Sequence, residues 1–452
     1  MIFDARQAAL ETLNTLDQGR DTLDNIMEAA FADDAGVSKR DRAFIQALVF
    51  GVLRWRGRLD FIIRHFSSTR FAKIDPTVLN ILRMALFQII YLDRVPESAA
   101  VNTAVQLAKT SVAPWVVGFV NAVLRKAARN YQALALPAVE KNAITATATA
   151  RSFPEWIIRR WAKRYGLDAT TALCDALNTI PAITVRTNRL KTSPHDLVNS
   201  LAGEAEQIKP TLCSPDGINF VSPVTSIPGL SAFKAGWFQV QDEAAQLVAL
   251  LLNPQPGETV LDACAGLGGK TGHIAQLMKN EGSIVALDIN AAKLVRLESE
   301  MQRLGISIVK TFRQDLEIKN LQPKFNQFDR ILLDAPCSGL GVMRRNPDIK
   351  WRTSKKKLTV FNGRQLTLLH NLSRLVKPSG VLVYAVCSPE PEENEDVVNE
   401  FLKKNAEFVI DKEVEGLPAK MLSIQAANGW FKTFPHFRYM DGFSFIRLIR
   451  TQ

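Results

Sequence analysis

Two cysteines in the second half of the chain directly follow predicted strands and are candidate nucleophiles. Cys337 stands in DRILLDAPCSGLG at 329–341, and Cys387 stands in GVLVYAVCSPEPEENE at 380–395. Each apolar run is typical of a buried strand, and each cysteine lies in a turn that contains proline or serine. Because thiolates are strong nucleophiles, one cysteine could attack an electron-poor carbon while the other assists release of the product.

The carboxyl ends of these strands predict where the two thiols lie. In an open α/β sheet the carboxyl ends of the strands line the ligand crevice, so we expect Asp334, Cys337 and Cys387 to converge there. A free cysteine has a pKa of about 8.5 and needs a favourable environment to act as a thiolate at neutral pH. Lys270 or a helix N-terminus could supply that environment.

The remaining cysteines suggest other roles. The chain has 5 cysteines and no CxxC pair, which argues against a disulfide framework or a zinc site, and we expect no metal. We interpret Cys174 and Cys213 as small buried hydrophobic residues. Cys264 lies in a glycine-rich loop, where a small side chain would pack against a ligand.

That loop is the second candidate site. The segment ETVLDACAGLGGKTGHIAQLM at 258–278 indicates a strand, a glycine-rich turn and a helix. In this layout, backbone N–H groups at a helix N-terminus closely approach a nucleotide-like ligand. IVALD at 284–288 predicts the next strand, which ends at Asp288, about 20 residues past the turn. A carboxylate there can accept hydrogen bonds from ribose hydroxyls.

Two other glycine-loop motifs fit this segment less well. Residues 269–271, Gly-Lys-Thr, resemble the end of a phosphate-binding Walker loop, but that pattern requires glycine at the position of Cys264. The dinucleotide fingerprint fails because Gly266 and Gly268 are followed by Thr271 where the third glycine belongs. A nucleoside triphosphatase and a dinucleotide-binding enzyme are therefore disfavoured.

Length, composition and charge limit the class of protein. A chain of 452 residues with 47% hydrophobic and 22% charged residues predicts two or three globular domains. The net charge of +11 favours a polyanionic partner, nucleic acid first, although a solvated basic surface is the alternative. The apolar run at 81–92 is too short to span a bilayer, which takes about 20 residues, and no export signal is recognised. We expect a cytoplasmic protein without a membrane partner.

The pattern along the chain predicts three domains. Residues 1–140 show helical periodicity, and the Ala/Thr-rich stretch at 142–150 is interpreted as a linker. A small α/β module is predicted at 151–235. From 236 to 452 strands alternate with helices, which indicates a parallel, doubly wound α/β domain.

Several motifs of the sequence resemble those of a known family. DACAGLGGKT, LDAPCSGLG and YAVCSPEPEENE look like the cofactor loop and the two cysteine motifs of RNA cytosine-5 methyltransferases of the Fmu/Sun/RsmB type. DRAFIQALVFGVLRW, VNTAVQLAK and GFVNAVLRK resemble the NusB-like helical domain of the bacterial members, so the resemblance covers the whole chain. It implies a Rossmann-like class I S-adenosylmethionine-dependent methyltransferase domain, preceded by an all-α NusB-like RNA-binding domain and a small α/β RNA-binding module.

The resemblance also implies a reaction. Its substrate would be a cytosine of 16S ribosomal RNA, before full subunit assembly, and its methyl donor S-adenosyl-L-methionine. Carbon 5 of cytosine is too weak a nucleophile to attack a methyl sulfonium, and adding a thiolate to carbon 6 raises its electron density. The family implies Cys387 as the nucleophile in this covalent adduct and Cys337 as the assistant in release. We expect a monomer that does not act on DNA.

Carried over by position, the cofactor site would comprise Cys264, Ala265, Gly266, Leu267, Gly268, Gly269 and Lys270. Asp288 would hold the ribose, Asp315 the adenine, and Asp334 would lie between cofactor and base. The sequence departs from the family at two places: Gly266-Leu267 replaces the usual Ala-Pro, and Val386 replaces the usual threonine before the nucleophile. Both departures leave the cofactor affinity open, and neither removes a reacting group.

Several alternatives stay open. The substrate could be another RNA such as tRNA, or the chain could be a non-catalytic RNA-binding ribosome assembly factor. A DNA cytosine-5 methyltransferase would have its nucleophile in the Pro336-Cys337 pair; the second cysteine and the NusB-like helices favour RNA. After the first cysteine, Arg344, Arg345 and Lys350 are interpreted either as phosphate contacts or as a solvated basic loop.

Overall fold

The computed structural model describes residues 4–19, 21–31, 37–318 and 325–451. Contacts between residues divide the chain into two compact units, each made of two segments. Unit 1 is Met1–Thr179 with Asn346–Arg352, and unit 2 is Ile180–Arg345 with Thr353–Gln452. The chain therefore leaves unit 2 shortly after Cys337, contributes a short segment to unit 1 and returns.

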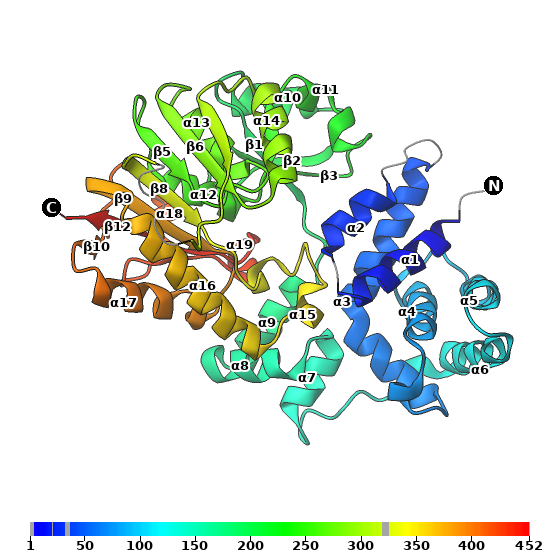
Figure 1. Ribbon diagram of the computed structural model, residues 1–452. Coiled ribbons are helices and arrows are strands. Elements are labelled where there is room, and N and C mark those ends of the chain that lie inside the picture. Colours follow the sequence, from blue (N-terminus) through cyan, green and yellow to red (C-terminus); the bar gives the residue numbers. More distant parts are fainter. Residues whose placement is uncertain (1–3, 20, 32–36, 319–324, 452) are drawn as a thin grey trace. The chain divides into compact units, whose positions relative to one another are not determined.

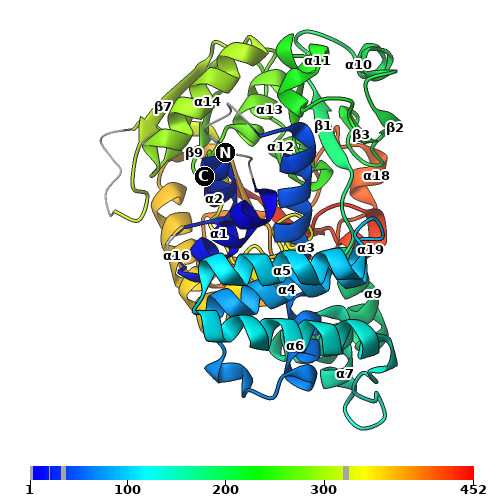
Figure 2. The same ribbon diagram turned by 90° about the vertical axis from the view of Figure 1, so that its right-hand side faces the viewer.

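Within its described residues, unit 1 is helical. Its helices are α1 (Ala5–Asp17), α2 (Leu23–Ala30), α3 (Lys39–Phe66), α4 (Pro76–Tyr91), α5 (Glu97–Ser111), α6 (Pro114–Asn130), α7 (Ala143–Arg151), α8 (Glu155–Tyr165), α9 (Leu167–Leu177) and the short α15 (Ile349–Arg352). Side-chain N-caps at Asp4, Ser38 and Asp75 fix where α1, α3 and α4 begin. Helices α4, α5 and α6 lie side by side (Figure 2).

The linker predicted at 142–150 is wrong, because this stretch forms helix α7. The side chain of Asn142 caps its first turn by accepting a hydrogen bond from the Thr145 N–H. Ala146 and Ala148 are buried, so the small side chains that suggested a linker allow close helix packing instead. The next helix, α8, follows at Glu155–Tyr165.

The first part of unit 2 is a small α/β module. Its elements are β1 (Ile183–Thr187), α10 (Pro194–Leu201), β2 (Glu206–Pro210), β3 (Gly217–Val221), α11 (Ser231–Lys234) and β4 (Phe238–Val240). The strands form an antiparallel sheet in the order β2-β3-β1-β4. Val185 of β1, Ile218 of β3 and Phe238 of β4 lie in a common core.

The rest of unit 2 is built around a larger sheet (Figure 1). Its strands are β5 (Thr259–Asp262), β6 (Ser283–Asp288), β7 (Val309–Arg313), β8 (Phe328–Asp334), β9 (Val376–Val386), β10 (Phe408–Ile410), β11 (Phe431–Lys432) and β12 (Ser444–Arg450). The order is β10-β12-β9-β8-β5-β6-β7, with β11 paired to β12. Strands β5 to β9 pair in parallel, and β12 is antiparallel to β9. The predicted doubly wound α/β domain is confirmed.

Helices cover both faces of this sheet. They are α12 (Glu243–Leu252), α13 (Gly269–Leu277), α14 (Ala291–Leu304), α16 (Lys355–Ser373), α17 (Glu395–Lys404), α18 (Ala419–Leu422) and α19 (Pro435–Arg438). Because neighbouring strand residues face opposite sides, Val260 packs with α12, α13 and α14, and Leu261 packs with α16 and α17. Burial of one such side chain contributes about 1.5 to 3 kcal/mol. The two cores hold the strand ends in fixed positions.

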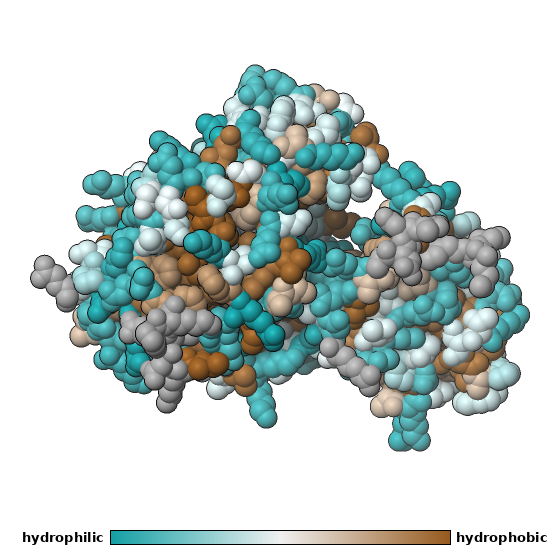
Figure 3. All heavy atoms as spheres, turned by 45° about the horizontal axis from the view of Figure 1, so that its top comes forward, coloured by the Kyte–Doolittle hydropathy of each residue, from teal (hydrophilic) through white to brown (hydrophobic). Residues whose placement is uncertain are grey.

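On the face drawn in Figure 3, hydrophilic residues cover much of the surface and hydrophobic residues form small separate patches. Among the described residues, no helix is long and apolar enough to cross a bilayer.

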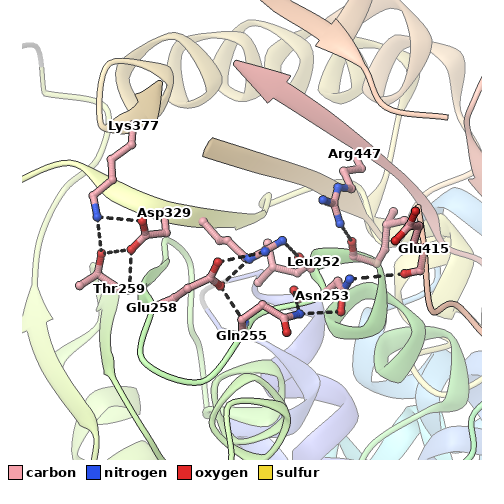
Figure 4. A network of polar contacts seen from close by, with 11 residues as sticks. Leu252, Asn253, Gln255, Glu258, Thr259, Asp329, Lys377, Glu415 and Arg447 are labelled. Atoms are coloured by element: carbon pink, nitrogen blue, oxygen red, sulfur yellow. Dashed lines mark hydrogen bonds and ion pairs between the residues drawn. The ribbon is translucent and has the colours of Figure 1, made fainter. Parts of the chain in front are cut away.

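A polar network ties the amino ends of three parallel strands together (Figure 4). Asp329 in β8 accepts hydrogen bonds from the N–H of Thr259 (2.8 Å) and from its hydroxyl (2.7 Å), at the start of β5. Lys377 in β9 donates to the other oxygen of Asp329 at 2.8 Å. Partial burial opposes ionisation of Asp329, but the bonds from Lys377 and Thr259 prevail and lower its pKa to about 2.

This network predicts a pH-dependent contribution to stability. The folded-state pKa of Asp329 lies below its unfolded value, so its contribution is complete above about pH 4 and is lost as the pH falls toward 2. Asp329→Asn should lower the free energy of unfolding at pH 7 by about 1 kcal/mol, a value reduced by solvent screening. Urea unfolding at pH 7 and pH 3 tests this. If wild type and Asp329→Asn differed equally in free energy of unfolding at both pH values, the role of the charge would be contradicted.

Candidate active site

Both cysteines lie at the carboxyl edge of the large sheet. Strand β8 ends at Asp334 and β9 at Val386, and the pairing continues one step further through a 2.8 Å bond from the Ala335 N–H to the Ala385 carbonyl. Cys337 and Cys387 follow in the two adjacent loops, with their sulfur atoms 3.2 Å apart. The structure therefore brings Asp334, Cys337 and Cys387 together at one edge of the sheet, as the sequence led us to expect.

The environment of the two thiols is asymmetric. The hydrogen bond with Cys387, burial, and the negative charges of Cys387 and Glu393 raise the pKa of Cys337 well above its usual range. Cys337 is thus kept as a protonated thiol. Its S–H can donate a hydrogen bond to the sulfur of Cys387, 3.2 Å away.

Lys270 supplies a positive charge at this edge of the sheet. Its Nζ donates to Asp334 Oδ2 at 2.5 Å and lies 5.3 Å from the centre of the Phe443 ring. Burial opposes its charge, but Asp334, Asp262 and Cys387 together raise its pKa, so Lys270 remains an ammonium ion. Of the two sources of positive charge considered from the sequence, Lys270 is therefore present at this edge of the sheet as a charged group.

The glycine-rich turn connects β5 to α13. Gly266 and Gly268 have positive φ angles of 57° and 83°, a conformation that favours glycine. At Gly268 a Cβ would also lie 2.7 Å from Leu297 Cγ, whereas at Gly266 it would meet no atom within 4 Å. One side of the turn is therefore packed against α14 and the other, at Gly266, is open. This is the shape that a closely approaching cofactor requires.

Asp288 ends β6 beside this turn. Its Oδ2 accepts the Gly266 N–H at 3.0 Å, and its Oδ1 accepts the Asn290 N–H at 2.8 Å. Each oxygen keeps a second lone pair for a ribose hydroxyl. Asp288 thus orients the turn and offers acceptors next to its open side.

The other predicted cofactor residues are placed around the same edge. Cys264 and Ala265 form the first part of the turn, and burial raises the pKa of Cys264, which therefore stays a thiol. Leu267 is 47% exposed, so its side chain is free to contact a ligand. Asp315 lies just past β7, where its Oδ1 accepts the Glu317 N–H at 2.9 Å.

Asp262 was not predicted as part of the site. It is the last residue of β5, has only 1% of its surface exposed, and accepts the Thr271 hydroxyl at 2.7 Å. Burial raises its pKa to about 7. The available signal was its place in LDACAG, where an acid ends an apolar strand.

The basic residues after Cys337 do not form the solvated loop that was one of the two interpretations. Arg344 and Arg345 pair with Asp441 at 3.1 Å and 2.6 Å, and Arg345 also pairs with Asp242 at 2.8 Å. They hold loops of unit 2 together. Lys350 is fully buried within unit 1, where it donates to Asn178 Oδ1 at 2.6 Å. None of these contacts is visible in the sequence, because each partner is distant along the chain.

Cys174 and Cys213 are buried, as predicted. Burial raises the pKa of Cys174 to about 12, which leaves it an uncharged thiol.

Three family models match separate parts of the chain. Residues 249–449 match the family described as 16S rRNA methyltransferase RsmB/F, residues 4–129 match the NusB family, and residues 153–226 match the ferredoxin-like domain of RsmF/B-like methyltransferases.

Individual relatives agree with these family matches. The probable ribosomal RNA small subunit methyltransferase B of Bacillus subtilis is 34% identical, with 97% of each chain covered. Its counterpart from Synechocystis is 35% identical, with 98% of each chain covered. The crystal structure of PH0851 superposes with a TM-score of 0.82 at 26% identity over 99% of both chains.

The fold, the glycine-rich turn and the comparisons together identify the chain as an S-adenosylmethionine-dependent methyltransferase. The open side of the turn at Gly266 and the Asp288 carboxylate suit this cofactor, which supplies a methyl group when bound. The chain belongs to the family of the ribosomal RNA small subunit methyltransferase B proteins and methylates ribosomal RNA.

The role of Asp288 can be tested by cofactor binding. Asp288→Ala removes acceptors for the ribose and for the Gly266 N–H, and loss of a bond to a charged group costs about 1.5 to 3 kcal/mol. Calorimetry with S-adenosylmethionine should therefore show affinity weaker by about one to two orders of magnitude. Asp288→Asn, which keeps one acceptor oxygen, should lose less. Wild-type affinity in folded Asp288→Ala would assign the ribose to another carboxylate.

Proposed function

We propose that this enzyme methylates carbon 5 of a cytosine in 16S ribosomal RNA through a covalent adduct between Cys387 and carbon 6 of the base. The observation that carries the proposal is the 3.2 Å pair of thiols beside the Lys270–Asp334 ion pair. A single cysteine would suffice for attack alone. Two adjacent thiols suit a reaction in which one attacks and the other promotes departure.

Each group has a separate task in this reaction. The Cys387 thiolate adds to carbon 6, and the electron pair of the carbon 5–carbon 6 bond shifts to carbon 5, which then accepts the methyl group. A base removes the proton from carbon 5, the double bond re-forms, and the bond between carbon 6 and Cys387 breaks. Cys337 donates its S–H to the departing sulfur, because its raised pKa keeps it protonated.

Lys270 and Asp334 support the first step. The ammonium group of Lys270 stabilises the Cys387 thiolate, since the charge of Cys387 is among those that raise the pKa of Lys270. Asp334, fixed by Lys270 at the end of β8, is the carboxylate available to hold the cytosine. We further propose that a monomer acts in the cytoplasm on the RNA before the small subunit is complete.

The proposal predicts different behaviour for the two cysteine variants. Cys387→Ala should neither methylate RNA nor form a covalent complex, because the activating addition is lost. The Cys337→Ala variant should form the covalent adduct and transfer one methyl group. It should then remain covalently joined to its RNA. Denaturing gels with 16S RNA and cofactor should show a slow-migrating band for Cys337→Ala alone, whereas Cys213→Ala, at a buried cysteine outside the site, should behave as wild type.

The same experiment separates the alternatives. A stable band from Cys387→Ala alone would invert the roles, as expected for a DNA-type enzyme. Methylation of tRNA in place of 16S RNA would change the substrate class. Methyl transfer to RNA without any 5-methylcytosine would place the methyl group on another atom.

A further inference from the structure

One buried carboxylate joins the two cysteine loops. Glu393 has no exposed surface. Its Oε1 accepts the Ser338 N–H at 2.7 Å, and its Oε2 accepts the Ser338 hydroxyl at 2.5 Å. The same Oε2 accepts the Ser388 hydroxyl. These two serines directly follow Cys337 and Cys387, so a single side chain is hydrogen-bonded to the neighbour of each thiol.

Glu393 is itself held from two sides. The Tyr384 hydroxyl donates to its backbone carbonyl at 2.6 Å. The fully buried Gln365 donates to the Pro336 carbonyl at 3.0 Å and to Glu393 Oε1 at 3.4 Å. Gln365 in α16 therefore holds the Glu393 carboxylate, and Tyr384 in β9 holds the Glu393 backbone.

Packing alone does not explain this arrangement. A buried carboxylate is costly unless it is well hydrogen-bonded, and an apolar side chain of similar size would fill the same space. Hydrogen bonds differ from apolar contacts in having direction, so they fix where each serine lies. Since a displacement of about 1 Å can cost about a hundredfold in rate, fixing the serines also controls the chemistry of the adjacent cysteines.

We propose that Glu393 is a positioning residue that sets the spacing of the two thiols, acting on Cys387 through Ser388 and on Cys337 through Ser338. This inference rests on the proposed function, because it assigns Ser388 to formation of the adduct and Ser338 to its release. Glu393 and the serines act through the cysteines and do not touch the base.

The two serines allow the steps to be separated. In single-turnover reactions with 16S RNA, Ser388→Ala should slow the rise of the covalent band about tenfold or more, the effect of losing a bond to a charged acceptor. Ser338→Ala should leave the rise near the wild-type rate and slow the decay of the band to a similar extent. Cofactor affinity should be unchanged in both. Ser373→Ala, at a buried serine that bonds to the His370 carbonyl, is the matched control.

A second pair of variants tests the carboxylate. Glu393→Asp keeps the charge but shortens the reach, so it should slow both the rise and the decay of the band. Glu243→Asp is its control, because Glu243 is a buried carboxylate that likewise binds a loop, at the N–H groups of Cys213 and Ser214. Glu243→Asp should lower thermal stability without changing either rate. If Glu393→Asp does not fold, the serine variants decide.

The outcomes distinguish this inference from the proposed function. Wild-type rise and decay in both folded serine variants would overturn the positioning role, as would equal slowing of both steps by each serine. If the wild-type enzyme forms neither an adduct nor 5-methylcytosine, the proposed function fails and this inference fails with it.

Discussion

Strands β8 and β9 pair in parallel as far as Asp334 and Ala385, and this pairing sets where both thiols lie. Two loops that are distant in the sequence begin at neighbouring points, so Cys337 and Cys387 meet without any direct bond between their backbones. Beyond the end of β8, the chain packs tightly at Gly341. A Cβ on Gly341 would lie only 1.8 Å from the Gly442 carbonyl oxygen, so a larger residue would not fit there. The site therefore depends on strand register, which the cores on both faces of the sheet maintain.

The charged residues near the strand ends give the two cysteines different electrostatic environments. Lys270 lies among acids and remains protonated, whereas Cys337 faces the buried Glu393 and a second sulfur that both oppose its ionisation. Two residues of the same type thus acquire different chemistry from their surroundings. Removing water from the site strengthens both effects, because electrostatic interactions grow as the local dielectric constant falls.

Much of the site could be predicted because it follows from strand ends. Asp288, Asp334 and the two cysteines each stand at or just past an apolar run, and the parallel sheet gathers such positions at one edge. Glu393 could not be assigned a role in this way, because its partners Ser338 and Ser388 are distant from one another along the chain and meet only in the fold. Lys350 was misjudged for a similar reason. A lysine in a basic loop is expected to be exposed to solvent. Lys350 is instead buried, and its ammonium group donates hydrogen bonds to carbonyl oxygens of unit 1.

The central claim is that Cys387, and not Cys337, carries the base. RNA with 5-fluorocytidine at the target position traps the adduct, because carbon 5 then bears no proton to remove after methyl transfer. Trypsin places the two cysteines on different peptides, 331–344 and 375–403, which mass spectrometry can distinguish. We predict a methylated nucleotide on the peptide that contains Cys387. The same nucleotide on the peptide that contains Cys337 would contradict the account.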